Sequence, residues 1–238
     1  MSEATSRAPF ELPDVTAYVV GVLGGTGEQG RGLATWLARM GQSVIIGSRN
    51  EQRAVDVAAE LNVTLSSIVG ASATVRGADN AECASRADVV IVAVPWDGHR
   101  DLLLALADQL ADKIVIDCVN PLGFDKQGPY ALAVDEGSAT QQAAACLPRS
   151  RVVGAFHHIS AVLLLDLAVN SIDTDVLVVG DDREATDVAQ ALASRITGVR
   201  GIYAGRLRNA HQIEAMTANL ISMNRRYKSH SGIRVTDV

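Results

Sequence analysis

The chain has 238 residues, of which 48% are hydrophobic and 20% are charged, a balance that is typical of packed globular proteins and argues against a disordered chain. Its net charge of −6 at pH 7 argues against a general binder of nucleic acids or membrane surfaces, because such proteins need an excess of Lys and Arg to meet phosphates. No segment approaches the ~20 apolar residues that cross a bilayer, so the sequence predicts neither a nucleic-acid nor a membrane partner.

The hydrophobic pattern predicts strands and helices that alternate from residue 17 onward. Short β-branched runs, typical of buried strands, occupy residues 17–23, 43–48, 72–76, 87–94, 113–119, 151–156 and 175–182. Segments with helical spacing of apolar residues occupy residues 29–40, 51–61, 79–85, 98–111, 138–146, 183–197 and 206–227. This alternation predicts an α/β fold with a Rossmann-type, doubly wound parallel sheet.

The cysteines and the N-terminus indicate the cellular compartment. Cys83, Cys118 and Cys146 are too far apart for a C-x-x-C pair, and an odd number cannot pair fully within one chain. Residues 1–14 lack the continuous apolar segment of a signal peptide. We therefore expect reduced thiols in a cytoplasmic protein, with residues 1–14 as a flexible tail.

A glycine-rich loop joins the first expected strand to the first expected helix. Residues 25–30, GTGEQG, fit the pattern G-x-G-x-x-G of dinucleotide-binding βαβ units. In that position Gly25 permits a tight turn, Gly27 lets the backbone approach a pyrophosphate, and Gly30 lets the helix pack closely. The free N–H groups at the helix N-terminus attract the same anion. The alternative is a glycine turn chosen only for its backbone geometry.

The end of the second expected strand indicates which dinucleotide is bound. An acidic residue there binds the ribose 2′-OH of NAD, whereas an arginine receives the 2′-phosphate of NADP. This chain has Ser48 and Arg49 at that point, and Arg53 follows four residues later. Two guanidinium groups with the hydroxyls of Ser48 and Thr26 suit a phosphate. The sequence therefore favours NADP, and the alternative is a pair of solvated arginines at a helix start, where a cation without an anion is disfavoured.

Several segments together resemble the deazaflavin-dependent NADP reductases, the NADPH:coenzyme F420 oxidoreductase family of archaea and actinobacteria. The segments are LGGTGEQGRGLA at 23–34, VIIGSR at 44–49, VAVPWDGH at 92–99, VNPL at 119–122, GAFHHISA at 154–161, VVGDD at 178–182 and RLRNAHQIEAMTANLISMNRRYKSHSGIR at 206–234. The resemblance spans most of the chain. It departs at Arg53, where archaeal relatives often carry Lys, and in residues 1–14, which have no counterpart in shorter relatives.

The resemblance implies an oxidoreductase that passes a hydride reversibly between NADPH and coenzyme F420, an 8-hydroxy-5-deazaflavin. NADP would be held by Thr26, Gly27, Glu28, Gln29, Ser48, Arg49 and Arg53, in addition to the structural glycines Gly25 and Gly30. The nicotinamide end would lie near Trp96, Arg100 and Ala161. The deazaflavin would lie near Asn120, His157 and the long C-terminal helix. Two small-molecule cofactors would thus be the partners of the protein.

Hydride transfer needs orientation and exclusion of water more than it needs a nucleophile or a metal. His157 and His158 follow an expected strand at its carboxyl end, where ligands bind in open α/β sheets. One of them is a candidate to stabilise charge on the deazaflavin, and the alternative is a polar link to backbone carbonyls. Trp96 also follows a strand, so it either walls the nicotinamide pocket or is a core aromatic.

The expected organisation is a tail over 1–14, an NADP-binding Rossmann domain over 15–160 and a smaller C-terminal α/β domain over 161–238 that caps the sheet edge. In the last helix, Ile213, Met216, Leu220 and Met223 form either a core face or the seam of a homodimer. Two other functions remain open: another NADP-dependent reductase on this fold, such as an imine or ferric reductase, or a non-catalytic NADP-sensing module.

Overall fold

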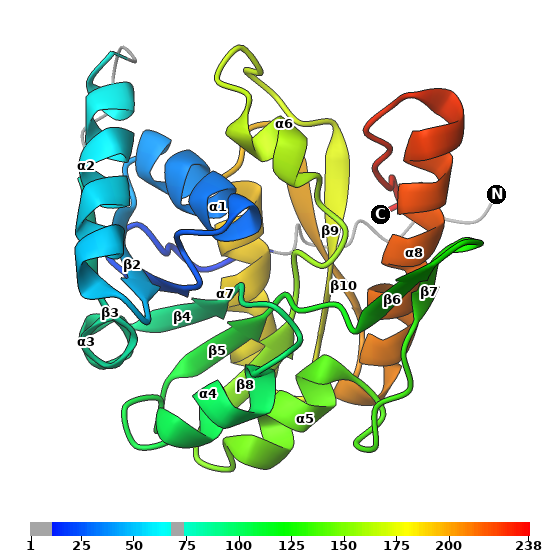
Figure 1. Cartoon of the computed structure of the whole chain (residues 1–238), viewed down its shortest axis with the longest axis horizontal. Helices are drawn as coiled ribbons and strands as arrows, with labels where there is room; N and C mark the ends of the chain where they lie inside the picture. Colours follow the sequence, from blue (N-terminus) through cyan, green and yellow to red (C-terminus); the bar gives the residue numbers. More distant parts are fainter. Residues whose placement is uncertain (1–10, 68–73) are drawn as a thin grey trace, which may run out of the picture.

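The computed structural model describes residues 11–67 and 74–238, and its centre is one eight-stranded sheet (Figure 1). The strands lie in the order β10-β9-β8-β5-β4-β1-β2-β3. Their bounds are β1 Val19–Leu23, β2 Ser43–Ser48, β3 Val75–Asp79, β4 Val89–Val92, β5 Ile114–Asp117, β8 Arg151–Gly154, β9 Thr174–Gly180 and β10 Val199–Gly205. Neighbouring strands are parallel, except that β8 and β9 are antiparallel. The sheet is therefore mostly parallel and doubly wound, as the sequence predicts.

Helices cover both faces of this sheet. One face packs against α1 Glu28–Arg39, α2 Glu51–Ser66, α6 Ala161–Leu165 and α7 Arg183–Ser194, and the other packs against α3 Asn80–Arg86, α4 His99–Ala105 and α5 Ala139–Cys146. Side chains alternate between the two cores along each strand: Val89 and Ile91 of β4 join the first core, whereas Val90 and Val92 join the second. The continuous apolar runs in the sequence follow from this burial on both faces.

The C-terminal helix lies at one side of the sheet. It comprises the short 3-10 turn η1 Leu207–Asn209 and α8 Ala210–Tyr227. It contacts α5 and a two-stranded hairpin, β6 Leu122–Asp125 and β7 Gly128–Ala131, which reaches across it (Figure 1). None of the helices in residues 11–67 and 74–238 is long and apolar enough to cross a membrane.

The observed elements agree closely with the expected ones over the first half of the chain. Strands expected at 17–23 and 43–48 are β1 and β2, and helices expected at 29–40 and 79–85 are α1 and α3. The helix expected at 51–61 continues to Ser66, and the one expected at 98–111 ends at Ala105. Residues 72 and 73 of the expected third strand lie outside the described residues, and β3 begins at Val75.

The sequence missed the β6–β7 hairpin, α6 and β10, and it placed a helix start at residue 206 where α8 begins at Ala210. The expected division of the chain into two domains at residue 160 stays a prediction. The sheet is continuous across it, since β9, which follows residue 160, pairs with β8 of the main sheet. Most of the expected N-terminal tail, residues 1–10, lies outside the described residues. Leu12, just beyond them, packs against the first core.

Candidate cofactor site

The glycine-rich loop lies where β1 ends and α1 begins. Its left-handed residue is Gly24, with a φ of 76°, rather than Gly25, to which the sequence analysis assigned the tight turn. Gly25 is required for a different reason, because a Cβ there would lie 2.5 Å from the Cβ of Ile46. A Cβ on Gly30 would lie 2.5 Å from the backbone oxygen of Gly24. The loop therefore packs tightly against its own backbone and β2.

Gly27 differs from the other glycines of this loop. It is exposed, and a Cβ at this position would meet only the backbone oxygen of Gly24, at 3.4 Å. It is also the N-cap of α1, and no side chain caps the first turn of that helix. The N–H groups at the N-terminus of α1 are therefore open to an anion. The glycine motif predicts that a pyrophosphate approaches the backbone at this residue.

Beside Gly27 lies a pocket of about 270 Å³, here called the arginine pocket. Its lining includes Thr26, Gly27, Ser48, Arg49 and Arg53, all of which the sequence placed at the NADP site. Arg49 and Arg53 are exposed. Within the described part of the chain, neither guanidinium has a carboxylate partner at ion-pair distance. The pocket therefore presents two uncompensated cations to an incoming anion.

Asn80 is a lining residue of the arginine pocket that sequence reasoning missed. It is the first residue of α3, directly after β3, and its buried Oδ1 atom has no hydrogen-bond partner among residues 11–67 and 74–238. Buried polar atoms without a partner are rare in folded proteins. The position after a parallel strand was the one available signal, because ligands gather at the carboxyl ends of such strands.

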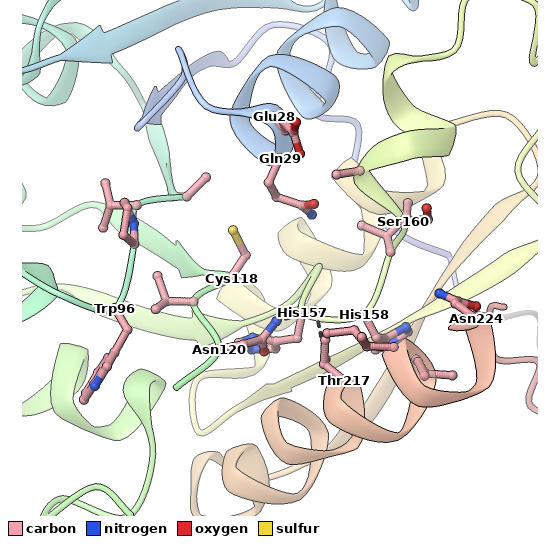
Figure 2. A pocket seen from close by; sticks show the side chains of 18 of the residues that line it. Glu28, Gln29, Trp96, Cys118, Asn120, His157, His158, Ser160, Thr217 and Asn224 are labelled. Carbon is pink, nitrogen blue, oxygen red and sulfur yellow. Dashed lines mark hydrogen bonds between the residues drawn. The ribbon is translucent and has the colours of Figure 1, made fainter. Parts of the chain in front are cut away.

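A second pocket, of about 500 Å³, lies at the carboxyl ends of β4, β5 and β8 and is closed on one side by α8 (Figure 2). We call it the histidine pocket. The predicted residues that line it are Glu28, Gln29, Trp96, Asn120, His157 and Ala161. Sequence reasoning missed Cys118, Thr217, Asn224 and Ser231, which line it as well. In Figure 2, Gln29 extends from the start of α1 into this space, and Trp96 lies at its far side from Asn224.

The two pockets share one wall. Ala93, Val94 and Pro95, in the loop after β4, line both of them. This loop lies beside the end of β1. The strand order reverses between β1 and β4: β2 and β3 lie on one side of this point, and β5, β8, β9 and β10 lie on the other. Open α/β sheets bind ligands at such a switch point. One extended ligand can therefore run from the arginine pocket past the glycine loop to the histidine pocket.

His157 is held by its backbone in the histidine pocket. Its carbonyl oxygen accepts hydrogen bonds from Asn120 Nδ2 at 2.6 Å and from Thr217 Oγ1 at 3.0 Å. In the described part of the chain, neither ring nitrogen makes a well-formed hydrogen bond, although the Val119 backbone favours the protonated ring. Burial dominates and lowers the pKa of His157. The preceding residue, Phe156, has a φ of 63°, an uncommon backbone conformation that turns the chain into the pocket.

His158 has a different environment. Its Nε2 atom accepts a hydrogen bond from the backbone N–H of Leu177 at 3.2 Å, so it links the loop to β9. Burial, and the neighbouring His157, lower the pKa of His158 to about 4. This ring is therefore neutral near pH 7 and serves the fold. Both histidines line the histidine pocket. Within the described residues, both ring nitrogens of His157 lack a well-formed hydrogen bond, whereas in His158 this holds for Nδ1 alone. The choice of His157 as the ligand-facing histidine therefore stays a prediction.

Trp96 and Arg100 lie on either side of the start of α4. Trp96 is half-buried, lines the histidine pocket and packs against the second core. Its place beside the nicotinamide stays a prediction. Arg100, which the resemblance placed near the nicotinamide, forms an ion pair with Glu136 and is not among the lining residues of either pocket. Its assignment to the cofactor has no support from the geometry.

Two buried carboxylates position the wall formed by α8. Glu214 accepts hydrogen bonds from the N–H groups of Ala139 and Thr140 at 2.9 and 3.0 Å and so caps α5. Capping by a carboxylate stabilises a helix N-terminus. Asp175, on β9, accepts a hydrogen bond at 2.7 Å from the backbone N–H of Val235 in the segment that follows α8. This contact fixes the C-terminal segment, which brings Ser231 to the pocket. These contacts join residues far apart in sequence, so they were invisible to pattern analysis.

Comparison with known proteins gives three informative likenesses. A protein of Methanothermobacter thermautotrophicus named F420-dependent NADP reductase is 40% identical over 230 residues, which cover 94% of this chain and 97% of that protein. Metalloreductase STEAP3 of Rattus norvegicus is 33% identical over 91% of this chain, but over only 38% of its own length. A solved structure described as a putative F420-dependent NADP-reductase from Arthrobacter has a TM-score of 0.74 at 26% identity and covers 92% of this chain and 99% of that one.

The family model agrees with these likenesses. Residues 19–121, which include the glycine loop, Arg49, Trp96 and Asn120, match the model described as NADP oxidoreductase, coenzyme F420-dependent. The relative from Methanothermobacter extends the match over nearly the whole chain. The chain therefore belongs to the family of coenzyme F420-dependent NADP oxidoreductases.

Proposed function

We propose that the protein transfers a hydride reversibly between NADPH and oxidised coenzyme F420. The observation that carries this proposal is the pair of adjacent pockets that share the wall 93–95. A redox reaction between two cofactors needs both to be bound at once and side by side. The names of the family and of the similar reductases supply the identity of the two cofactors.

NADP would bind along the glycine loop with its 2′-phosphate in the arginine pocket. The open cradle at Gly27 and the uncapped N-terminus of α1 suit a pyrophosphate. Arg49, Arg53 and the hydroxyls of Thr26 and Ser48 suit a phosphate monoester. The residues present therefore fit the group that the family name implies.

Coenzyme F420 would bind in the histidine pocket, between His157 and α8. The bound cofactors supply the hydride chemistry. The protein orients them and excludes water: Trp96, Cys118 and Leu220 provide apolar lining, while Asn120 and Thr217 hold the backbone of His157. A neutral His157 ring in this position can donate one hydrogen bond to an anionic ring edge without carrying a charge itself.

The first test is an assay that follows the absorbance of the deazaflavin after the purified protein is mixed with NADPH and oxidised F420. We expect F420 to be reduced, and F420 to be re-formed when reduced F420 is mixed with NADP. Oxidation of NADPH at the same rate without F420, or a failure to reduce F420, would contradict the proposal. An imine substrate and a ferric chelate are then the acceptors to test, and NADPH binding without any turnover would indicate a sensing module.

His157→Ala should separate the two sites. We expect it to lower kcat with F420 by about tenfold, the loss of a hydrogen bond of about 1–1.5 kcal/mol. The dissociation constant of NADPH should stay nearly unchanged, because His157 does not line the arginine pocket. Steady-state kinetics with both substrates varied, together with a calorimetric titration of NADPH, measure the two effects.

His211→Ala is the matched control, because this exposed histidine lies at the start of α8 and lines neither pocket. We expect it to behave like the wild type. F420 should also bind more tightly when NADP is already present, since stacking on the first cofactor adds contact area that the empty site lacks. A fall in NADPH affinity with His157→Ala would remove the assignment of separate sites.

We also propose the division of roles that the sequence indicates, with residues 15–160 holding NADP and residues 161–238 covering F420. The buried free thiols of Cys83, Cys118 and Cys146 are consistent with the reducing cytoplasm as the compartment. A homodimer stays a prediction. Ile213 and Leu220 of its expected seam are buried within the monomer, whereas Met223 is exposed.

A further inference from the structure

A buried polar network lies directly beneath the wall that the two pockets share. At its centre is His99, the first residue of α4, whose side chain is 0% exposed. Its Nε2 atom lies 2.6 Å from Asp117 Oδ2, and its Nδ1 atom lies 3.0 Å from Gln142 Oε1. Asp117 is also fully buried. Nothing in the proposed hydride transfer uses either residue.

The hydrogen-bond pattern defines the protonation state of His99. Gln142 Nε2 donates to Glu136 Oε2 at 3.1 Å, so the Oε1 atom of Gln142 is the one that faces His99. An amide oxygen and a carboxylate oxygen only accept hydrogen bonds. Both ring nitrogens of His99 must therefore donate, which requires the doubly protonated imidazolium.

The charges around His99 agree with this assignment. The charged groups packed around it are Arg100 on its own helix, Asp117 on β5, Glu136 behind Gln142, and Glu214 on α8. Burial works to lower the pKa of His99, but the Asp117 carboxylate, the hydrogen bonds to Asp117 and Gln142, and the charge of Glu214 outweigh it and raise the pKa above its usual value. The first turn of a helix disfavours a cation, so the ring depends on Asp117 for its charge.

This ion pair joins the two loops that line the pockets. The backbone N–H of His99 donates to the carbonyl of Trp96 at 3.1 Å, and the two rings lie 5.6 Å apart between centroids. On the other side, Asp117 Oδ1 accepts the backbone N–H of Val119 at 2.9 Å. Loop 93–98 and residues 118–120 supply much of the lining of the histidine pocket, and loop 93–98 also lines the arginine pocket.

We propose that protonated His99 is a positioning residue that ties loop 93–98 to the end of β5 and so makes NADP(H) binding depend on pH. The inference rests on the proposed function only in that NADP(H) binds from the arginine pocket along the shared wall 93–95. Below the raised pKa of His99 the ion pair is intact and the shared wall is held. As the pH rises through that pKa, the ring loses one proton, one of its two hydrogen bonds is lost, and the wall loosens.

The test is the dissociation constant of NADPH measured by calorimetry from about pH 6 to about pH 9, a range that brackets ordinary and raised histidine pKa values. For the wild type we expect affinity to fall as the pH rises through the folded-state pKa of His99. For His99→Gln, which keeps one donor but cannot titrate, we expect weaker binding at low pH, by about tenfold, a size typical of residues that act through their neighbours. Its affinity should not show the fall at higher pH.

Two controls make the result specific. The 2′-phosphate of NADPH itself titrates near pH 6, but it does so equally in every variant. His211→Gln should therefore keep the wild-type profile. Asp117→Asn should move the fall in affinity to lower pH, because His99 loses the anion that holds its proton.

Thermal unfolding of the same variants separates positioning from a role in folding alone. A lower melting temperature with an unchanged affinity and pH profile in His99→Gln would overturn the proposal, and so would a wild-type profile that matches that of the variant. A wild-type protein that fails to bind NADPH at any pH would instead refute the proposed function. NADPH titration without F420 thus distinguishes the two failures.

Discussion

Gly27→Val is expected to abolish NADPH binding while the free protein keeps nearly its original melting temperature. Gly27 is exposed and has a φ of −82° and a ψ of 165°, which any residue adopts. A Cβ there contacts only the oxygen of Gly24, at 3.4 Å, so the folded protein tolerates it. The same Cβ and its two methyl groups would occupy the space through which a pyrophosphate approaches the N-terminus of α1. Calorimetric titration with NADPH and thermal unfolding measure the two properties.

Gly30→Ala is the matched control in the same loop. A Cβ on Gly30 would lie 2.5 Å from the oxygen of Gly24 and 2.8 Å from the Cα of Gly25, and both neighbours are backbone atoms. We expect this variant to lose about 1–3 kcal/mol of stability, the usual cost of overpacking. Retained NADPH binding in Gly27→Val would remove the glycine cradle from the site. Unfolding of Gly27→Val would show that the residue is needed for the loop itself.

The N-terminal half of the fold was predictable because local pattern and tertiary environment agree there. The runs that became β1 and β4 are continuously apolar, since helices cover both faces of the sheet. The glycine loop follows the first strand directly, and its spacing is a local property of the chain. The arginine pocket was predictable for the same reason, because Ser48 and Arg49 follow β2 in sequence as well as in space.

The missed elements lack such local signals. The strand β10 contains two interior polar or small residues, Arg200 and Gly201, and the glycine is required because a Cβ would lie 2.4 Å from the Cα of Gln190 on α7. The strand β7 contains Pro129, which weakens a strand prediction. The contact that explains Gly201 comes from the packing of α7 on β10, which the local pattern of the strand does not reveal.

The histidine pocket was predictable only in part, for the same physical reason. Asn120 and His157 follow strands, so their place at the sheet edge could be expected. Thr217 and Asn224 lie on α8, and only the packing of that helix brings them to the pocket. Gly24 shows the limit at finer scale: the motif located the turn, but which glycine takes the positive φ depends on backbone contacts with the loop after β4.

Arg49→Ala is expected to lower the preference for NADPH over NADH, measured as the ratio of kcat/KM values, by about tenfold to about a hundredfold. This corresponds to the loss of about 1.5–3 kcal/mol, the range for a hydrogen bond to a charged group. Arg49 directly follows β2 and lines the pocket with Ser48 and Thr26. Because the guanidinium has no ion-pair partner among the described residues, its removal should leave kcat/KM with NADH nearly unchanged.

Arg53→Ala should lower the preference for NADPH over NADH by less than Arg49→Ala does. Arg53 lies in the first turn of α2, whereas Arg49 directly follows β2, so we expect Arg53 to be the secondary partner of the phosphate. Arg76→Ala is the matched control, since Arg76 is an exposed arginine of β3 that does not line the arginine pocket. Both Arg49 and Arg53 are exposed, so added salt should also reduce the wild-type preference for NADPH by screening the two charges.

An unchanged ratio of kcat/KM values in Arg49→Ala would show that the 2′-phosphate binds elsewhere. An equal loss of kcat/KM with NADPH and NADH would show that Arg49 serves the loop rather than the phosphate.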